Sequence, residues 1–357
     1  MNSCYMLRAI KLAENGIGFV NPNPLVGAVI VRDGEIIGEG YHECCGGLHA
    51  ERNALKNCIK PPEGADMYVT LEPCCHHGKT PPCTDAVIES GIKRVFIGSP
   101  DPNPLVAGKG VEILRKNGIE VIENFERASC DAINEVFFHY ITKKTPYVIM
   151  KYAMTLDGKI ACRTGKSRWI TGEDARHNVH VDRHRYSAIM TGIGTVLADD
   201  PMLDCRIEGG RNPVRIICDT RLRTPLNSRI VKTAKDIRTV IATCELNGHQ
   251  PYVNMGCELI TVSKRDGHVN LQKLMSELGK TGLDSVILEG GGELNWSALS
   301  CGTVNRVQAY IAPKIFGGGG FSPVSGAGFS FPDESIKLSD VTVKNIGGDY
   351  LIEGKVL

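Results

Sequence analysis

Apolar segments of strand length alternate with helix-like segments along most of this chain, and this alternation limits the folds it can adopt. In the first half, strand-like runs lie at 26–31, 36–38, 67–71, 94–97 and 121–122, and helix-like runs at 5–14, 50–58, 84–90 and 111–117. Such an order predicts an α/β/α sandwich, with helices on both faces of a sheet. The dipeptide Asp33-Gly34 between two strand-like runs predicts one antiparallel hairpin.

A polar segment that contains a proline interrupts the alternation at residues 142–146. The proline ends a helix there, and a new strand-like run follows at 147–152. Because domains usually hold roughly 100–200 residues, we expect two, at 1–144 and 145–357. The second continues the α/β order, with a helix at 174–187, strands at 188–192, 214–219, 239–243 and 285–289, and a glycine-rich end.

The balance of charges argues against a nucleic acid or a membrane as the partner. The 41 lysine and arginine residues face 40 acidic ones, so no basic excess attracts a polyanion. The N-terminus lacks a basic stretch before an apolar run, and no window approaches about 18 uninterrupted apolar residues. We therefore expect a cytoplasmic protein that acts on a small molecule. Its 14 cysteines then serve as metal ligands or buried apolar groups.

One histidine and two cysteines lie where expected helices and strands begin or end. His49 precedes the helix-like run 50–58, Cys74 follows the strand-like run 67–71, and Cys83 precedes the next helix. One imidazole and two thiolates form a three-ligand zinc site whose fourth position can hold water, which is typical of a catalytic site. Glu51, two residues after His49, is placed to accept and return the proton of that water.

The spacing of these residues is a variant of a known signature. Zinc-dependent base deaminases combine His-x-Glu with Pro-Cys-x-x-Cys, whereas here eight residues separate Cys74 from Cys83. A zinc knuckle without catalysis, or a set of buried thiols, would use the same residues. Cys75 is a second candidate thiolate, but we favour Cys74 because it directly follows Pro73.

Glycine runs mark the second half of the chain. Residues 290–292 follow a strand-like run and precede a possible helix, so their amides could bind a phosphate or diphosphate. The full Gly-x-Gly-x-x-Gly spacing of a dinucleotide-binding unit is absent. The runs at 192–194, 290–292 and 317–320 could therefore be ligand loops or ordinary turns.

Longer segments of both halves resemble one known family. The first half resembles the bifunctional deaminase/reductase of riboflavin biosynthesis at three segments. They are residues 38–42, His49-Ala50-Glu51 and the expanded cysteine loop 72–83 with Thr80-Pro81-Pro82. The segments 151–161, 167–171, 199–203 and 288–292 are similar to the reductase half of that family. The resemblance implies a cytidine-deaminase-like α/β/α sandwich followed by a dihydrofolate-reductase-like α/β domain.

The resemblance also implies roles for individual residues. Zn²⁺ is bound by His49, Cys74 and Cys83, and Glu51 is the catalytic proton carrier. The deaminase substrate is contacted by Asn23, His42, His76 and Lys79. NADPH is contacted by Ala153, Trp169, Thr195, Asp199, Thr220, Gly291 and Gly292. The reductase substrate is contacted by Ser167, Arg183, Leu203, Arg206 and Glu289. Arg183 and Arg206 suit a phosphate group, while Asp204-Cys205 and Cys75 depart from the family pattern.

The resemblance implies two reactions. The first is hydrolytic deamination of 2,5-diamino-6-(5-phosphoribosylamino)pyrimidin-4-one, and the second is reduction of the ribosyl group to ribityl by NADPH. One alternative is a nucleoside or tRNA deaminase with an unrelated C-terminal domain, although few aromatic residues (6%) argue against single-strand binding. Others are a non-enzymatic zinc protein and a family member with one inactive half. The apolar content of the second half permits a dimer or tetramer, and we expect a homo-oligomer.

Overall fold

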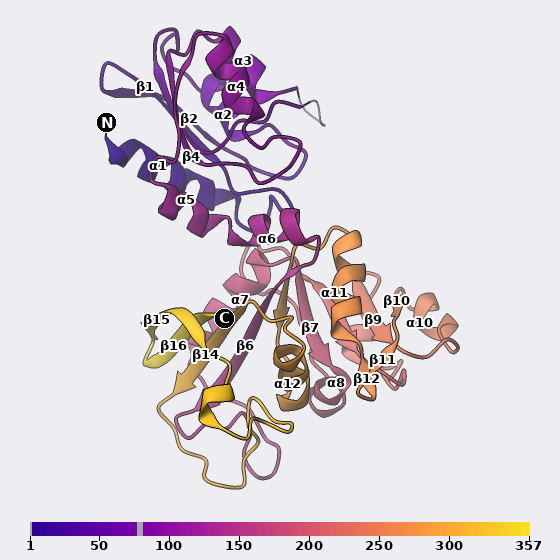
Figure 1. Ribbon diagram of the computed structural model, residues 1–357. Helices are drawn as coiled ribbons and strands as arrows, with labels where there is room; N and C mark the ends of the chain where they lie inside the picture. Colours follow the sequence, from indigo (N-terminus) through magenta and orange to yellow (C-terminus); the bar gives the residue numbers. More distant parts are fainter. Residues whose placement is uncertain (1, 77–80) are drawn as a thin grey trace. The chain divides into compact units, whose positions relative to one another are not determined.

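The computed structural model describes residues 2–76 and 81–357. The chain divides into two compact units, Met1–Lys144 and Thr145–Leu357 (Figure 1). None of the helices in the described residues is both long and apolar enough to span a bilayer.

Unit 1 contains a five-stranded sheet of order β2-β1-β3-β4-β5. Its strands are β1 (Gly27–Arg32), β2 (Glu35–Tyr41), β3 (Asp66–Leu71), β4 (Arg94–Ser99) and β5 (Glu120–Ile122). Its helices are α1 (Ser3–Ala13), α2 (Ala50–Lys56), α3 (Cys83–Glu89), α4 (Lys109–Lys116), α5 (Arg127–Ile133) and α6 (Glu135–Lys143), with a 3₁₀ turn at Glu14–Gly16. The predicted hairpin is confirmed: β1 and β2 are antiparallel, and Asp33 and Gly34 turn the chain with φ of 51° and 82°.

Successive residues of the strands in unit 1 enter cores on opposite faces of the sheet. Ala28 and Ile30 pack with the core that includes α2, α3 and α4, while Val29 and Val31 pack with α1 and the Cys130 region of α5. This period of two is what a strand buried on both faces requires. The predicted α/β/α sandwich is therefore confirmed.

The packing of α1 on β1 depends on a residue without a side chain. A Cβ atom on Gly27 would lie 1.9 Å from the carbonyl oxygen of Ala9. Gly27→Ala should therefore lower the free energy of unfolding of unit 1 by about 1–3 kcal/mol or more, because helix and strand must move apart. Urea denaturation measures the loss.

A control for Gly27→Ala is available in the β1–β2 turn. Gly34 has open space around its Cβ position, and asparagine tolerates its left-handed backbone. Gly34→Asn should change the free energy of unfolding by no more than about 0.5 kcal/mol. Equal losses from Gly27→Ala and Gly34→Asn would contradict the packing account.

Unit 2 contains a nine-stranded sheet of order β10-β9-β8-β7-β13-β6-β14-β16-β15. Its strands are β6 (Tyr147–Thr155), β7 (Ala188–Gly192), β8 (Val214–Cys218), β9 (Thr239–Thr243), β10 (Glu258–Thr261), β13 (Ser285–Leu288), β14 (Arg306–Ala312), β15 (Leu338–Ile346) and β16 (Asp349–Val356). A separate pair is formed by β11 (Lys264–Arg265) and β12 (His268–Val269). In the order of the sheet, the strands β10, β9, β8, β7, β13, β6 and β14 are all parallel. The strands β16 and β15 are antiparallel to their neighbours and form one edge of the sheet.

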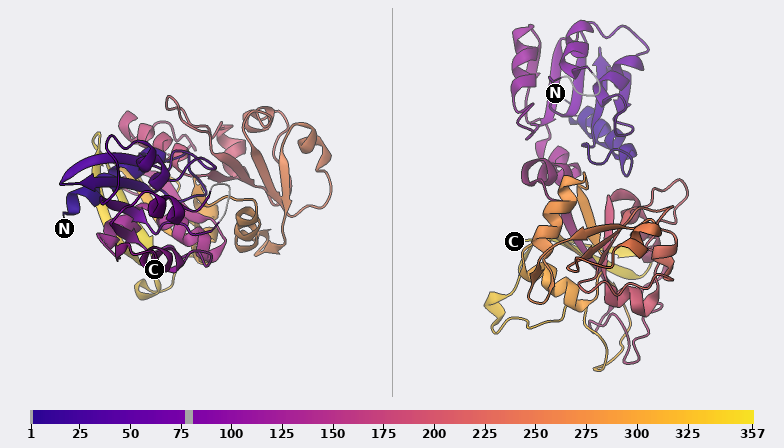
Figure 2. Two further views of the ribbon diagram at one scale, coloured as in Figure 1. Left: turned by 90° about the horizontal axis from the view of Figure 1, so that it is seen from above. Right: turned by 90° about the vertical axis from the view of Figure 1, so that its right-hand side faces the viewer.

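Helices pack on both faces of this sheet (Figures 1 and 2). They are α7 (Glu173–Arg185), α8 (Ile193–Asp199), α9 (Arg229–Lys232), α10 (Gln250–Asn254), α11 (Leu271–Lys280) and α12 (Gly292–Ser300), with a 3₁₀ turn at Pro332–Glu334. The core of α11 and α12 includes Val148 and Met150 of β6, whereas α7 packs with Tyr310 and Leu351.

The C-terminal part differs from the sequence-based description of a glycine-rich end. It forms β14, β15 and β16. β14 and β16 are largely buried, whereas β15 is an edge strand with side chains such as Val341 and Val343 exposed. A strand with so little burial has no clear alternation of apolar and polar residues.

Candidate active sites

Three metal-ligand side chains converge in unit 1. His49 lies at the N-cap of α2, Cys74 follows β3, and Cys83 is the first residue of α3. The His49 Nδ1 atom is 3.4 Å from the Cys74 Sγ and 3.3 Å from the Cys83 Sγ. Nitrogen and sulfur ligands around tetrahedral zinc would lie roughly 3.5 Å apart. The residues therefore fit a Zn²⁺ ion.

The charge state of the thiols suits metal binding. A hydrogen bond from the Cys83 thiol, aided by His49, lowers the pKa of Cys74 to about 4 even though burial opposes the shift. The same contact and burial raise the pKa of Cys83. The pair therefore loses a proton more readily than a free thiol, and a bound metal ion would deprotonate both sulfur atoms. Cys75 lies outside this cluster and donates instead to the Leu105 carbonyl oxygen at 3.8 Å.

Glu51 lies in the first turn of α2, directly beside the cluster. Its side chain is buried, with 3% of the residue exposed. Burial raises the pKa of the Glu51 carboxyl, and the neighbouring Cys74 thiolate adds to the rise. A carboxyl whose pKa is raised holds a proton more readily than an exposed one, as a proton carrier requires.

The cluster opens on a cavity of about 370 Å³ within unit 1. Among the residues predicted to contact substrate, Asn23, His42 and His76 line it. The Asn23 Nδ2 lies 3.1 Å from the His42 Nε2, and the His42 Nδ1 lies 3.0 Å from the Leu48 carbonyl oxygen. Lys79 lies outside the described residues.

Two residues that line the cavity are not among the site residues predicted from the sequence. Asp101 and Asn103 follow β4, where Asp-Pro-Asn-Pro has the composition of an ordinary turn. Burial raises the pKa of Asp101 to about 6. The available signal is their position: β4 is the parallel neighbour of β3, which ends beside Cys74, and ligands bind beyond the carboxyl ends of such strands.

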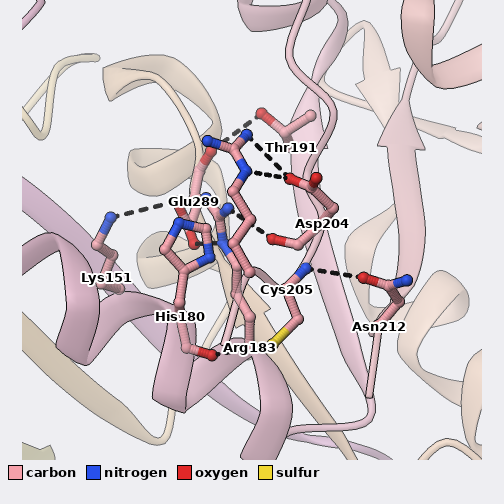
Figure 3. Close-up of polar contacts among 9 residues, drawn as sticks. Lys151, His180, Arg183, Thr191, Asp204, Cys205, Asn212 and Glu289 are labelled. Atoms are coloured by element: carbon pink, nitrogen blue, oxygen red, sulfur yellow. Dashed lines mark hydrogen bonds and ion pairs between the residues drawn. The ribbon is translucent and has the colours of Figure 1, made fainter. Parts of the chain in front are cut away.

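A second cluster of charged residues lies in unit 2 (Figure 3). Glu289, directly after β13, receives two hydrogen bonds from Arg183 of α7, each 3.0 Å long, and one of 3.2 Å from Lys151 of β6. Burial alone would raise the pKa of Glu289, but the charges of Arg183 and Lys151 outweigh it and hold the pKa well below its usual range. The carboxylate form of Glu289 is therefore favoured.

The Arg183 guanidinium also ties this cluster to the 203–206 segment. Its Nη1 donates to the Asp204 carbonyl oxygen at 3.0 Å, and the Arg206 Nε donates to the Asp204 carboxylate at 3.0 Å. Leu203 is buried with a left-handed φ of 52°, a conformation that costs a leucine energy and is found at functional sites. Four of the predicted reductase substrate residues thus lie together. Ser167 is half-buried in the loop before α7 and does not hydrogen-bond to this cluster within the described part of the chain.

Most residues predicted to contact NADPH lie near the carboxyl ends of parallel strands. Gly291 is the N-cap of α12, which starts at Gly292 after β13. A Cβ on Gly291 would meet nothing within 4 Å, whereas one on Gly292 would lie 2.7 Å from the Ser322 carbonyl oxygen, so the start of this nine-residue helix is open on the side of Gly291 only. Free amides at such a helix start fit a diphosphate, so the residues present suit the cofactor.

The remaining predicted cofactor residues belong to other elements of unit 2. Thr195 and Asp199 belong to α8, which follows β7, the neighbour of β13. Ala153 lies near the end of β6, and Thr220 follows β8, where its hydroxyl accepts from the Val269 amide. Trp169 is 61% exposed, with the Arg176 guanidinium 4.5 Å from its ring centre.

Known proteins resemble the chain over nearly its full length. The family described as RibD C-terminal domain matches residues 146–352, and the cytidine and deoxycytidylate deaminase zinc-binding region matches residues 1–99. The chain is 54% identical over 356 residues to riboflavin biosynthesis protein RibD of Actinobacillus pleuropneumoniae, which covers 99% of this chain and 95% of the relative. The chain belongs to the RibD family.

Other RibD proteins support the same assignment. The Escherichia coli protein is 40% identical over 326 residues, covering 88% of each chain. A structure from Thermotoga maritima, named diaminohydroxyphosphoribosylaminopyrimidine deaminase/5-amino-6-(5-phosphoribosylamino)uracil reductase, has 41% identity and a TM-score of 0.88, covering 99% of this chain and 98% of that one. The chain is thus a bifunctional RibD enzyme of riboflavin biosynthesis, with a zinc-binding deaminase domain and a reductase domain. The alternative of an unrelated C-terminal domain is not supported.

Proposed function

We propose that unit 1 deaminates 2,5-diamino-6-(5-phosphoribosylamino)pyrimidin-4-one and that unit 2 reduces the ribosyl group of the product with NADPH. The observation that carries this proposal is the convergence of His49, Cys74 and Cys83 beside buried Glu51 at a 370 Å³ cavity. The small size of the cavity and its mostly apolar lining, with a few polar side chains among it, suit a small heterocycle and not a polymer.

In the deaminase, His49, Cys74 and Cys83 would hold Zn²⁺, which supplies Lewis acidity to a water molecule when bound. Glu51 accepts a proton from that water and returns it to the exocyclic amine. The water oxygen bonds to the ring carbon as the C–N bond to the amine breaks, ammonia leaves, and the second proton of the water passes to the ring nitrogen. The Asn23 and His42 pair at the cavity wall orients the ring by hydrogen bonds.

In the reductase, NADPH supplies the hydride, and the amides at the start of α12 would hold its diphosphate. The Glu289 cluster fixes Lys151 and Arg183 in a buried, ordered arrangement beside this end of the sheet. Arg206 has a half-exposed side chain and can offer its donors to the phosphate of the substrate.

The proposal also includes the location of the protein and its assembly into oligomers. All 14 cysteines are free, which supports a reducing, cytoplasmic location. Exposed apolar residues on the edge strand β15, such as Val341 and Val343, support assembly into a homo-oligomer.

Removal of the metal tests the division of labour. Protein stripped of zinc by a chelator should lose deaminase turnover by at least about 10²-fold and recover it when Zn²⁺ is restored. Reductase turnover on the deaminated substrate should change less than about twofold, because it uses none of these ligands. Deamination that persists in metal-free protein would contradict the assignment of the zinc site.

A further inference from the structure

A buried asparagine forms a link inside unit 1 that the proposed mechanism does not use. Asn134 is 2% exposed and lies between α5 and α6. Its Nδ2 donates to the Leu25 carbonyl oxygen at 2.9 Å, and its Oδ1 accepts from the Leu25 amide at 2.8 Å. The side-chain amide therefore pairs with the Leu25 backbone much as a neighbouring strand would.

The two segments that this link joins both line the cavity. The segment on either side of Leu25 contributes cavity residues, as does helix α6, which begins directly after Asn134. These residues are Asn23, Pro24 and Val26 on the first wall and Phe137, Tyr140 and Ile141 on the second. The two hydrogen bonds hold the walls together across 109 residues of sequence.

The first wall is connected to the metal ligand His49 through Asn23 and His42. Asn23 contacts His42 at 3.1 Å, and the His42 ring lies edge-on to the His49 ring with 5.3 Å between their centres. A shift of the Leu25 backbone would therefore move Asn23 relative to His42. Because hydrogen bonds weaken steeply with distance and angle, such a movement should weaken the binding of the ring and so raise KM.

The Asn134 side chain hydrogen-bonds to the Leu25 backbone instead of capping helix α6. It is the N-cap of α6, where asparagine normally accepts a hydrogen bond from the first turn of the helix and contributes about 1 kcal/mol. No such capping bond is formed, although its carbonyl oxygen accepts the Phe138 amide and so begins the helix. A side chain that forgoes its local role for a distant contact points to a functional constraint.

We propose that Asn134 is a positioning residue of the deaminase site, which sets the Asn23 wall at the distance from α6 that the pyrimidine ring requires. The inference rests on the proposed function of unit 1. It assigns no contact with substrate to Asn134 itself, because the side chain is committed to Leu25.

The variant that tests it is Asn134→Asp, which keeps the shape of the side chain and replaces the donor with an oxygen. At pH 8 this oxygen faces the Leu25 carbonyl oxygen, so KM for the pyrimidine should rise roughly tenfold or more, as the loss of one buried hydrogen bond implies. The kcat should change less than about threefold, with zinc content and reductase turnover unchanged. As the pH falls, protonation of the introduced carboxyl restores a donor, and the ratio of KM to wild-type KM should fall toward one.

A matched control separates positioning from general packing. Leu25→Ala removes the side chain and keeps both backbone hydrogen bonds, so KM should stay within about threefold of wild type. Wild-type KM for Asn134→Asp, or a rise that does not depend on pH, would overturn the inference while leaving the proposed function intact. A wild-type protein that does not deaminate the pyrimidine would instead overturn the proposed function.

Wild-type protein also allows a test if Asn134→Asp fails to fold. Exchange of the Leu25 amide hydrogen should slow when the pyrimidine is bound, because the ligand fixes both walls that the link joins. An exchange rate at Leu25 that the pyrimidine does not change would overturn the inference.

Discussion

Glu51→Gln should lower deaminase turnover by about 10²–10⁴-fold, because glutamine keeps the size of the side chain but cannot accept and return a proton. The zinc content should match wild type, since the ligand atoms belong to His49, Cys74 and Cys83. Reductase turnover should also match, because the change lies in unit 1. Initial rates of ammonia release and metal analysis of the same preparation measure these effects.

A surface glutamate provides the control for Glu51→Gln. Glu35 is exposed and pairs with Lys60 at the surface of unit 1, so Glu35→Gln should leave deamination unchanged. Turnover of Glu51→Gln within tenfold of wild type, with zinc in place, would show that another group carries the proton.

The second large effect is expected from Glu289→Gln. Its carboxylate forms ion pairs with both Arg183 and Lys151, whose side chains are 13% and 11% exposed. Glutamine removes the carboxylate that pairs directly with both buried cations, so the free energy of unfolding of unit 2 should fall by about 3–5 kcal/mol. Reductase turnover should be lost, while deamination by the same protein persists.

An exposed pair of the same kind provides the control for Glu289→Gln. Arg238 and Glu258 also form two hydrogen bonds, but their side chains are 40% and 50% exposed. Glu258→Gln should cost less than about 1 kcal/mol, because water screens the charges. Similar losses for the two variants in urea denaturation would contradict the importance of burial at Glu289.

The fold of unit 1 was largely readable in the sequence. Its strands are buried on both faces and its helices are short and separated by turns, so the apolar runs stand out. The hairpin at Asp33-Gly34 is local chemistry, and both residues adopt the left-handed backbone that such a turn needs. In unit 2 the exposed edge strand β15 lacks such a pattern, and it was not predicted.

The zinc cluster could be predicted because its residues are chemically specific and occur at element ends. Other parts of the sites depend on contacts between distant segments, which no local pattern encodes. The pairing of Arg183 with Glu289 spans 106 residues, and its significance becomes visible only when α7 lies beside the end of β13. The predicted residues Arg183 and Arg206 were assigned to phosphate, and the structure adds that both also hold acidic or carbonyl groups of this chain.

We propose that one chain performs both reactions in sequence, and a single assay tests this. Zinc-loaded protein would be incubated with the diaminopyrimidine ribosyl phosphate, and the product mass would be recorded with and without NADPH. The account predicts a gain of about one mass unit without NADPH, from exchange of the amine for oxygen, and about two further units with it. An unchanged mass under both conditions, or reduction without prior deamination, would contradict the account.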